Sequence, residues 1–449
     1  MTELKLPKNQ SKPARYLRCK DGELSAERMI GLYILLSLGA FLSYTVGSMT
    51  AFVAIRDSFS DLWDSVSYAC NINGYLDNGI LYPPASSLVL LWIGKIVSNC
   101  GLIAGSRKLT LICYGAIGLG GILGAYFYAY YSFAKGKIEK EYSKISIFEI
   151  FAMSCMCPPF LFGLTRMNTT LLVVPVAMAM IIYAEKKSNI YLYIALAVLP
   201  FIKPTLVLIG LIYCIWTLKM HKTIQAVLLY AAVYAIVNYW MFSLAGYNGD
   251  ITLWGKNLLH FGSQVSTDWR FSYYSYNPLD IDYLKYNQFF VHLGNLASLK
   301  AKLVYTATVL ASITALASTC YTGFAITKCG LQLYKLKQLK ATSPSCILCF
   351  ALLTTCYILL WTSKTAGAYS LSVVVPLIAY FALMNNAMKY RKACCILMGC
   401  SLYLLLPINI IAWSAKLPTI ISFAWLATLI AKDIIDLNSS QADLRSSNC

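Results

Sequence analysis

Apolar stretches of about twenty residues recur along the whole chain, and they limit the possible folds more than any other feature. A stretch of this length can cross the hydrocarbon core of a bilayer as a helix. Of the 449 residues, 58% are hydrophobic and 12% are charged, whereas roughly a quarter are charged in a soluble domain. We therefore predict an all-α polytopic membrane protein with about twelve transmembrane helices. The expected spans are 29–54, 109–134, 146–164, 168–184, 190–201, 204–218, 223–245, 300–327, 345–361, 367–388, 393–414 and 417–432.

Basic residues cluster at the amino terminus and in short loops between these spans, and the formal net charge is +18. In a soluble protein this charge would suggest nucleic acid, but Lys and Arg in short loops mark the cytoplasmic side of a membrane protein. We expect membrane lipid around the chain and no nucleic-acid partner. Residues 1–28 form a basic cytoplasmic terminus without the apolar region of a cleavable signal. A transmembrane domain over 29–432 and a cytoplasmic tail over 433–449 are expected to follow.

Two long segments, 55–108 and 246–299, fall on the outer side in this topology. The polar residues that could take part in a reaction are concentrated in them. This distribution predicts a substrate at the outer face. The expected location is a bacterial inner membrane, with the site on the periplasmic side.

Two segments need special treatment in this topology. The stretch 84–99 follows Pro83, contains Lys95 and is barely long enough to span, so we expect it to be re-entrant or to lie along the membrane surface. The stretch 190–218 is too long for one span and is interrupted by Lys203 and Pro204, a charge beside a helix breaker. Two short helices that meet at this break would place Lys203 at the outer side of the bundle.

The sixteen cysteines lie mostly inside apolar spans, where they are typical of small buried hydrophobic residues. Cys346 and Cys349 have the spacing of a zinc half-site, but no second pair follows and the chain has only three histidines. We therefore expect no cofactor, while the sequence leaves the involvement of a divalent metal open.

Polar residues occur in a fixed order along the chain. Asp61, Asp64 and Tyr68 follow the first span, and Tyr82-Pro83-Pro84 heads the next apolar run. The later members of the series are Gly163-Leu-Thr-Arg166-Met-Asn168, Lys203-Pro204, Asn277-Pro-Leu, Trp361-Thr-Ser-Lys364 and Tyr369.

This order resembles the GT-C glycosyltransferases, which take a sugar from a polyprenyl-phosphate carrier, and is nearest to the mannosyltransferase-like glycosyltransferase family 87. The resemblance covers roughly residues 30–390 and is most specific in the Asp-x-x-x-Tyr element and the Tyr-Pro-Pro that follows. It implies a GT-C bundle with short surface helices in the outer loops, and a catalytic base at Asp64. The chain has Arg166 where the family usually has Gln, and a His common in the late outer segment is absent.

Transfer from a phosphate-linked sugar to a hydroxyl needs a base for the acceptor proton and positive charge for the departing phosphate. We assign the base to Asp64, with Asp61, three residues earlier on the same helical face, as the main rival. Aromatic residues, including Tyr75 and Trp254, could stack on sugar rings. The candidates for substrate binding are Tyr68, Tyr82, Arg166, Asn168, Lys203, His260, Trp269, Arg270, Asn277, Lys364 and Tyr369.

Each candidate also has an ordinary structural explanation. An Asp in an outer loop is often only solvated, and Lys or Arg at a span end often extends toward the interface. Tyr and Trp at span ends form an interfacial belt, and Asn168 could simply cap a helix.

The sequence thus predicts an integral membrane glycosyltransferase. It would move a hexose, mannose-like, or a pentose from a polyprenyl-phosphate donor to a lipid-linked or polysaccharide acceptor. One alternative is a transporter or flippase of lipid-linked saccharides, which is disfavoured because the acids lie in a loop and no internal repeat is visible. Another is a polysaccharide polymerase, for which paired arginines in the outer loops would be expected.

Overall fold

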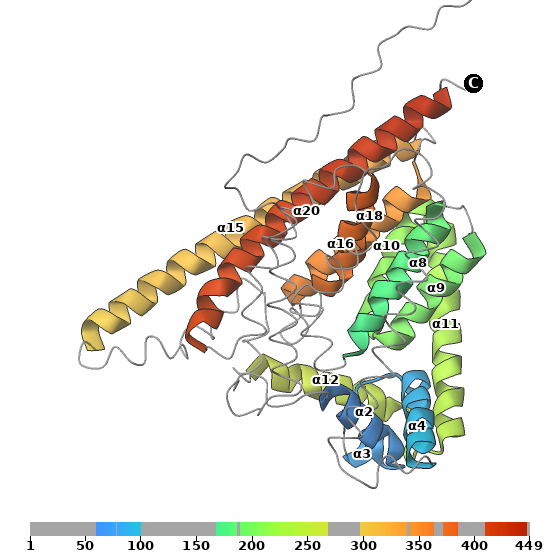
Figure 1. Ribbon diagram of the computed structural model, residues 1–449. Helices are drawn as coiled ribbons and strands as arrows, with labels where there is room; N and C mark the ends of the chain where they lie inside the picture. Colours follow the sequence, from blue (N-terminus) through green and yellow to red (C-terminus); the bar gives the residue numbers. More distant parts are fainter. Residues whose placement is uncertain are drawn as a thin grey trace, which may run out of the picture.

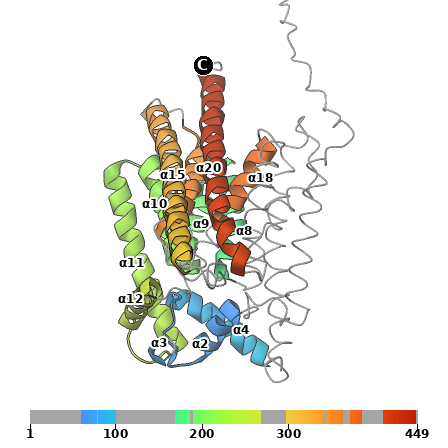
Figure 2. The same ribbon diagram turned by 90° about the vertical axis from the view of Figure 1, so that its left-hand side faces the viewer.

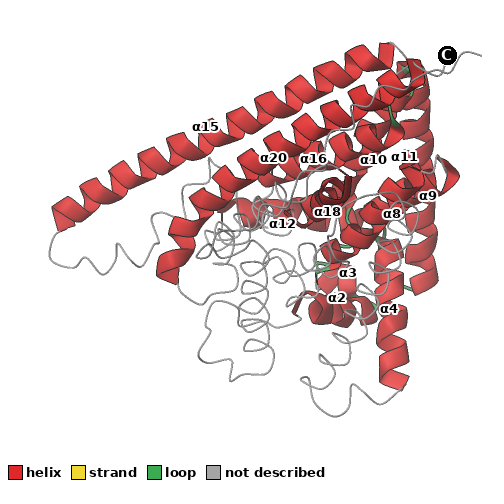
Figure 3. Cartoon of the chain, turned by 45° about the horizontal axis from the view of Figure 1, so that its top comes forward, coloured by secondary structure: helices red, strands yellow, loops and turns green. Residues whose placement is uncertain are grey.

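A computed structural model describes residues 60–77, 79–99, 168–185, 189–267, 297–338, 342–362, 371–384 and 409–446. All regular structure in these ranges is helical (Figure 3), which confirms the helical fold class but not the number of spans. Expected spans 29–54, 109–134 and 146–164 lie outside the described residues, as does most of 393–414.

Four helices gather at one end of the molecule, below the others in Figures 1 and 2. They are α2 (Ser60–Cys70), α3 (Gly74–Asp77), α4 (Pro84–Asn99) and α12 (Thr252–Thr267). We call these four helices the end layer. It is built from the two segments, 55–108 and 246–299, in which the sequence concentrates polar residues.

A bundle of shorter helices lies above the end layer (Figure 1). Its members are α8 (Val173–Glu185), α9 (Asn189–Ile202), α10 (Val207–Thr217), α16 (Pro344–Thr362) and α18 (Val375–Met384). Single turns of 3-10 helix precede α8, α10 and α18, at Thr169–Leu172, Pro204–Leu206 and Leu371–Val374. The bounds of α9 and α16, and those of α10 together with its preceding 3-10 turn, agree with the expected spans 190–201, 345–361 and 204–218 to within a residue or two.

Helix α11 (Met220–Ala245) runs beside the bundle and reaches the end layer (Figures 1 and 2). In the part of the chain that the structure describes, it is the one helix long and apolar enough to cross a membrane. Only 11% of its apolar window is buried inside the protein, so large side chains such as Ile236 and Trp240 face outward. An exposed apolar surface of this extent is suited to lipid.

The two longest helices, α15 (Ala297–Gln338) and α20 (Asn409–Ser446), pack along each other on the far side of the bundle (Figure 1). They differ from two expectations. The basic stretch from Lys328 follows the expected span 300–327 and so belongs to an expected loop, but it is helical as far as Gln338, because lysine, leucine and glutamine favour helix. The prediction that one span ends at 414 and another begins at 417 is wrong, because α20 is continuous there. The same helix extends through most of 433–449.

Candidate functional site

Helix α2 carries both acidic candidates. Asp61 lies in its first turn, Asp64 follows three residues later, and both side chains are half-buried. The hydroxyl of Ser65 donates a hydrogen bond to the Asp61 carbonyl within the same helix. An acidic residue in the first turn is favoured there by the partial positive charge of a helix amino terminus.

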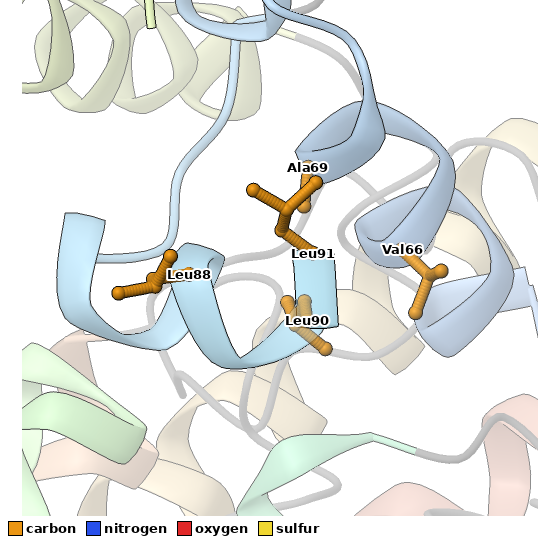
Figure 4. Packing of buried hydrophobic residues seen from close by; sticks show 5 residues of the cluster. All are labelled: Val66, Ala69, Leu88, Leu90 and Leu91. Carbon is orange, nitrogen blue, oxygen red and sulfur yellow. The ribbon is translucent and has the colours of Figure 1, made fainter. Parts of the chain in front are cut away.

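Apolar packing fixes α2 against α4. Figure 4 shows Val66 and Ala69 of α2 facing the leucines of α4, Leu88, Leu90 and Leu91. Gly94 of α4 allows the close approach, because a Cβ there would collide with Cys70 Sγ and lie 3.1 Å from Val66 Cγ1. The position of the two acids is therefore tied to α4.

Tyr75 of α3 is the centre of a buried junction between residues 75–87 and the region where α11 ends and α12 begins. Its hydroxyl donates to the Tyr82 carbonyl and contacts Ser87 Oγ, both at 2.9 Å. Its ring packs on Phe242 and Tyr247 at centroid distances of 5.3 and 5.0 Å. Burial raises the pKa of Tyr75, so the phenol stays protonated and remains a donor. Because Tyr75 is 1% exposed, its ring has no free face for a sugar, contrary to the stacking role considered for it.

Side chains from the α11–α12 region bind the backbone of residues 69–85 around this junction. Tyr247 Oη donates to the Ala69 carbonyl at 2.8 Å, and Asn257 Nδ2 to the Tyr75 carbonyl at 2.8 Å. Trp254 Nε1 donates to the Leu81 carbonyl at 3.0 Å, and the Ala85 amide donates to Asn238 Oδ1 at 3.1 Å. The bonds to Leu81 and Ala85 fix the backbone on both sides of the Tyr82-Pro83-Pro84 turn.

The chain between α11 and α12 turns sharply through two glycines. Gly246 and Gly249 have φ of 72° and 92°, in the region that residues with a Cβ rarely adopt. The turn brings Asn248 to the end of α2, where its amide donates to the Ile72 carbonyl at 3.0 Å and its Nδ2 to Asn73 Oδ1 at 2.7 Å.

Lys203 occupies the break between α9 and the 3-10 turn at Pro204. Its backbone is extended, with φ −151° and ψ 121°, so it belongs to neither helix. The residue keeps some exposed surface, but its amine lies inside the protein. Burial lowers the pKa of this amine to about 8, and the nearby charge of Asp61 acts in the opposite direction.

Asn168 completes the group. Its Nδ2 donates to Asp61 Oδ2 at 2.7 Å, across 107 residues of sequence. The structure thus brings three predicted site residues, Asp61, Asn168 and Lys203, to one place from three separate segments. A carboxylate held by an amide beside a buried amine can accept a proton, and the amine can bind an anion.

The remaining predicted residues are more scattered. Tyr68 is exposed on α2, and Tyr82 is half-buried at the junction with Tyr75. His260 is exposed on α12, with its Nε2 3.0 Å from Gln264 Nε2. The other members, which lie outside the described residues, are Arg166, Trp269, Arg270, Asn277, Lys364 and Tyr369.

Sequence reasoning missed the residues that support the site. Ser86, Tyr234 and Asn238 bind backbone atoms at the Lys203 break and the start of α4. The one available signal was the pair Tyr234 and Asn238, four residues apart in the middle of a mainly apolar span.

No group of three or more His, Cys, Asp or Glu side chains that could hold a metal ion occurs within the described ranges. The chain matches no family model, no curated protein and no solved structure.

Proposed function

We propose that the protein is a membrane glycosyltransferase of the GT-C type, with about twelve spans and an outer-face site. It transfers a hexose, mannose-like, or a pentose from a polyprenyl-phosphate donor to a lipid-linked or glycan acceptor. The observation that supports this proposal best is the group of Asp61, Asn168 and Lys203, in which a carboxylate and a buried amine meet at the end layer.

In the proposed reaction Asp61 is the general base. The acceptor oxygen forms a bond to the anomeric carbon as the bond from that carbon to the phosphate oxygen breaks. The acceptor proton passes to the Asp61 carboxylate, and the polyprenyl phosphate leaves with the bonding electrons. Asn168 holds the carboxylate in place through its 2.7 Å hydrogen bond.

Lys203 supplies positive charge for the phosphate. At pH 7 an amine with a pKa of about 8 is mostly protonated, so it can bind the donor phosphate and stabilise the charge that develops as the phosphate leaves. This role requires the protonated form, so donor binding is expected to weaken as the pH rises through about 8.

The proposal moves the base from Asp64 to Asp61, because Asp61 accepts the hydrogen bond from Asn168 and its charge acts on Lys203. Asp64 lies one helical turn away on α2 and stays the alternative base.

The decisive experiment compares Asp61→Asn with Asp64→Asn in a transfer assay that uses purified protein and a panel of radiolabelled polyprenyl-phosphate sugars. Removing the proton acceptor while keeping the shape should lower turnover by about 100-fold or more. The thermal stability of Asp61→Asn should stay close to that of the unmodified protein.

The same comparison distinguishes Asp61 from Asp64 as the base and tests the mechanism as a whole. Loss of transfer only in Asp64→Asn moves the base back to Asp64. Full activity in both variants contradicts the glycosyltransferase mechanism.

A second candidate is a transporter or flippase of lipid-linked saccharides. The observation that favours it is the pair of short helices, α9 and α10, that meet at Lys203, because discontinuous helices form the substrate sites of many transporters. Translocation of a labelled lipid-linked saccharide by reconstituted protein, without transfer of its sugar, would support this candidate.

A further inference from the structure

The break at Lys203 leaves carbonyls at the end of α9 without their usual helical donors, among them those of Pro200 and Phe201. In a helix, each carbonyl accepts from the amide four residues later. Four residues after Pro200 stands Pro204, which has no N–H. Phe201 loses its partner because the chain becomes extended at Lys203.

Side chains from two other helices bind the carbonyls of Pro200 and Phe201. Tyr234 of α11 donates its hydroxyl to the Pro200 carbonyl at 3.3 Å, and Ser86 of α4 donates to the Phe201 carbonyl. The Tyr234 ring also packs on Phe201, with a centroid distance of 4.7 Å. An unbonded carbonyl in such a place would cost free energy unless the chain moved to reach water.

We propose that Tyr234 and Ser86 are positioning residues: they fix the α9 break and thereby direct Lys203 toward Asp61. This inference rests on the proposed function only for the role of Lys203 in donor binding. The positioning itself concerns the geometry of the chain.

Tyr230 provides a matched control in the same helix. Its hydroxyl donates to the Ala197 carbonyl of α9 at 3.1 Å, one turn before the Tyr234 bond. The Ala197 carbonyl lies inside α9, where Phe201 supplies the usual amide four residues later. Tyr230→Phe and Tyr234→Phe therefore remove the same kind of bond between the same two helices, and only the second lies at the break.

The test follows the titration of Lys203 directly. Competitive acetylation with a small anhydride over a pH series, with the Lys203 peptide quantified by mass spectrometry, gives the apparent pKa of this one amine. In the unmodified protein it should be about 8. Because burial is the larger cause of that low value, loosening the break should admit water and raise the apparent pKa by about one unit, toward the ordinary value near 10.4.

We expect this rise in Tyr234→Phe and in Ser86→Ala, and an unchanged midpoint in Tyr230→Phe. All three variants should fold, because each replacement is smaller than the original side chain and apolar. Unchanged midpoints in Tyr234→Phe and Ser86→Ala would overturn the inference. So would an equal rise in Tyr230→Phe, because the effect would then belong to any contact between α9 and α11.

The labelling result does not depend on turnover, so it separates this inference from the proposed function. With active protein, Tyr234→Phe should raise KM for the polyprenyl-phosphate sugar and lower kcat, each several-fold, because Lys203 both binds the donor phosphate and stabilises it as it leaves. Tyr230→Phe should change neither. A protein with the expected labelling pattern but no transfer on any donor supports the positioning role and contradicts the glycosyltransferase.

Discussion

In the end layer, polar side chains bind backbone atoms of segments far away in the sequence. The bundle is held mainly by apolar contact, except where Tyr230, Tyr234 and Ser86 bind carbonyls of α9. Tyr247, Trp254 and Asn257 each bind the backbone of residues 69–81. In the bundle, by contrast, Thr354 and Thr355 of α16 bury hydroxyls without a hydrogen-bond partner among the described residues.

The difference shows what each region requires. Apolar packing tolerates small shifts between helices, because many similar contacts replace one another. A hydrogen bond to a chosen carbonyl fixes the register of the chain. The end layer needs fixed register because it carries Asp61, whose partners Asn168 and Lys203 come from other segments.

The largest effect on stability is expected from Phe381→Ala in the bundle. Phe381 is fully buried on α18, in edge contact with Tyr380 at 5.0 Å. Truncation leaves a cavity and should lower the free energy of unfolding by about 3–5 kcal/mol. Thermal unfolding in detergent micelles measures it. A loss below that of the end-layer variants would mean that the bundle does not dominate stability.

Next in size is Gly94→Ala, which tests the close approach of α2 and α4. The added methyl would meet Cys70 Sγ, so the helices must separate, at a cost of about 1–3 kcal/mol. Gly255→Ala is the control, because a Cβ added at Gly255 in α12 would have no neighbouring atom within 4 Å. The control should gain about 0.5–1 kcal/mol from the better helix propensity of alanine. Equal losses in both variants would contradict the contact.

Tyr75→Phe should cost about 1–2 kcal/mol, because it removes the hydroxyl that joins the Tyr82 carbonyl to Ser87 and keeps the ring. The effect should be local. Hydrogen exchange should therefore accelerate in residues 79–87 before it does in the bundle. Tyr239→Phe, at an exposed position of α11, is the control and should change nothing measurable. Uniform acceleration throughout the protein would show that the end layer and the bundle unfold together.

The smallest effect should have the opposite sign. Thr355→Val replaces a buried hydroxyl without a partner among the described residues by a methyl group of similar shape. We expect a gain of up to about 1 kcal/mol, since no hydrogen bond is lost. A clear loss in the same thermal assay would indicate that the hydroxyl has a structural role.

Much of the helical layout could be predicted, because helix bounds follow from local features. The apolar run of 223–245 predicted α11, and Pro204 predicted the break beside Lys203. The same reasoning placed Asp61 and Asp64 on one helical face after the first expected span. It failed at 415–416, where α20 continues without a break.

The grouping of the site was not predictable in the same way. Asp61 and Asn168 are 107 residues apart, and the Asp-x-x-x-Tyr pattern favoured Asp64, with Asp61 as its rival on the same helical face. The choice between the two acids depends on the rotation of α2 about its own axis as it packs on α4. The spacing of apolar residues defines this rotation only loosely. Likewise, Tyr75 is an ordinary loop tyrosine in the sequence, and only the fold shows that it is enclosed by Phe242 and Tyr247.

The length of α15 has a practical consequence for imaging. A helix of 42 residues extends about 63 Å at about 1.5 Å per residue, and the hydrocarbon core of a bilayer is only about 30 Å thick. Whatever part of α15 enters the membrane, roughly half of it must project beyond, with α20 packed beside it. The pair is thus a stiff rod, and a rigid marker fused in helical phase after Ser446 would give electron microscopy a fixed feature for orienting single particles of this small protein.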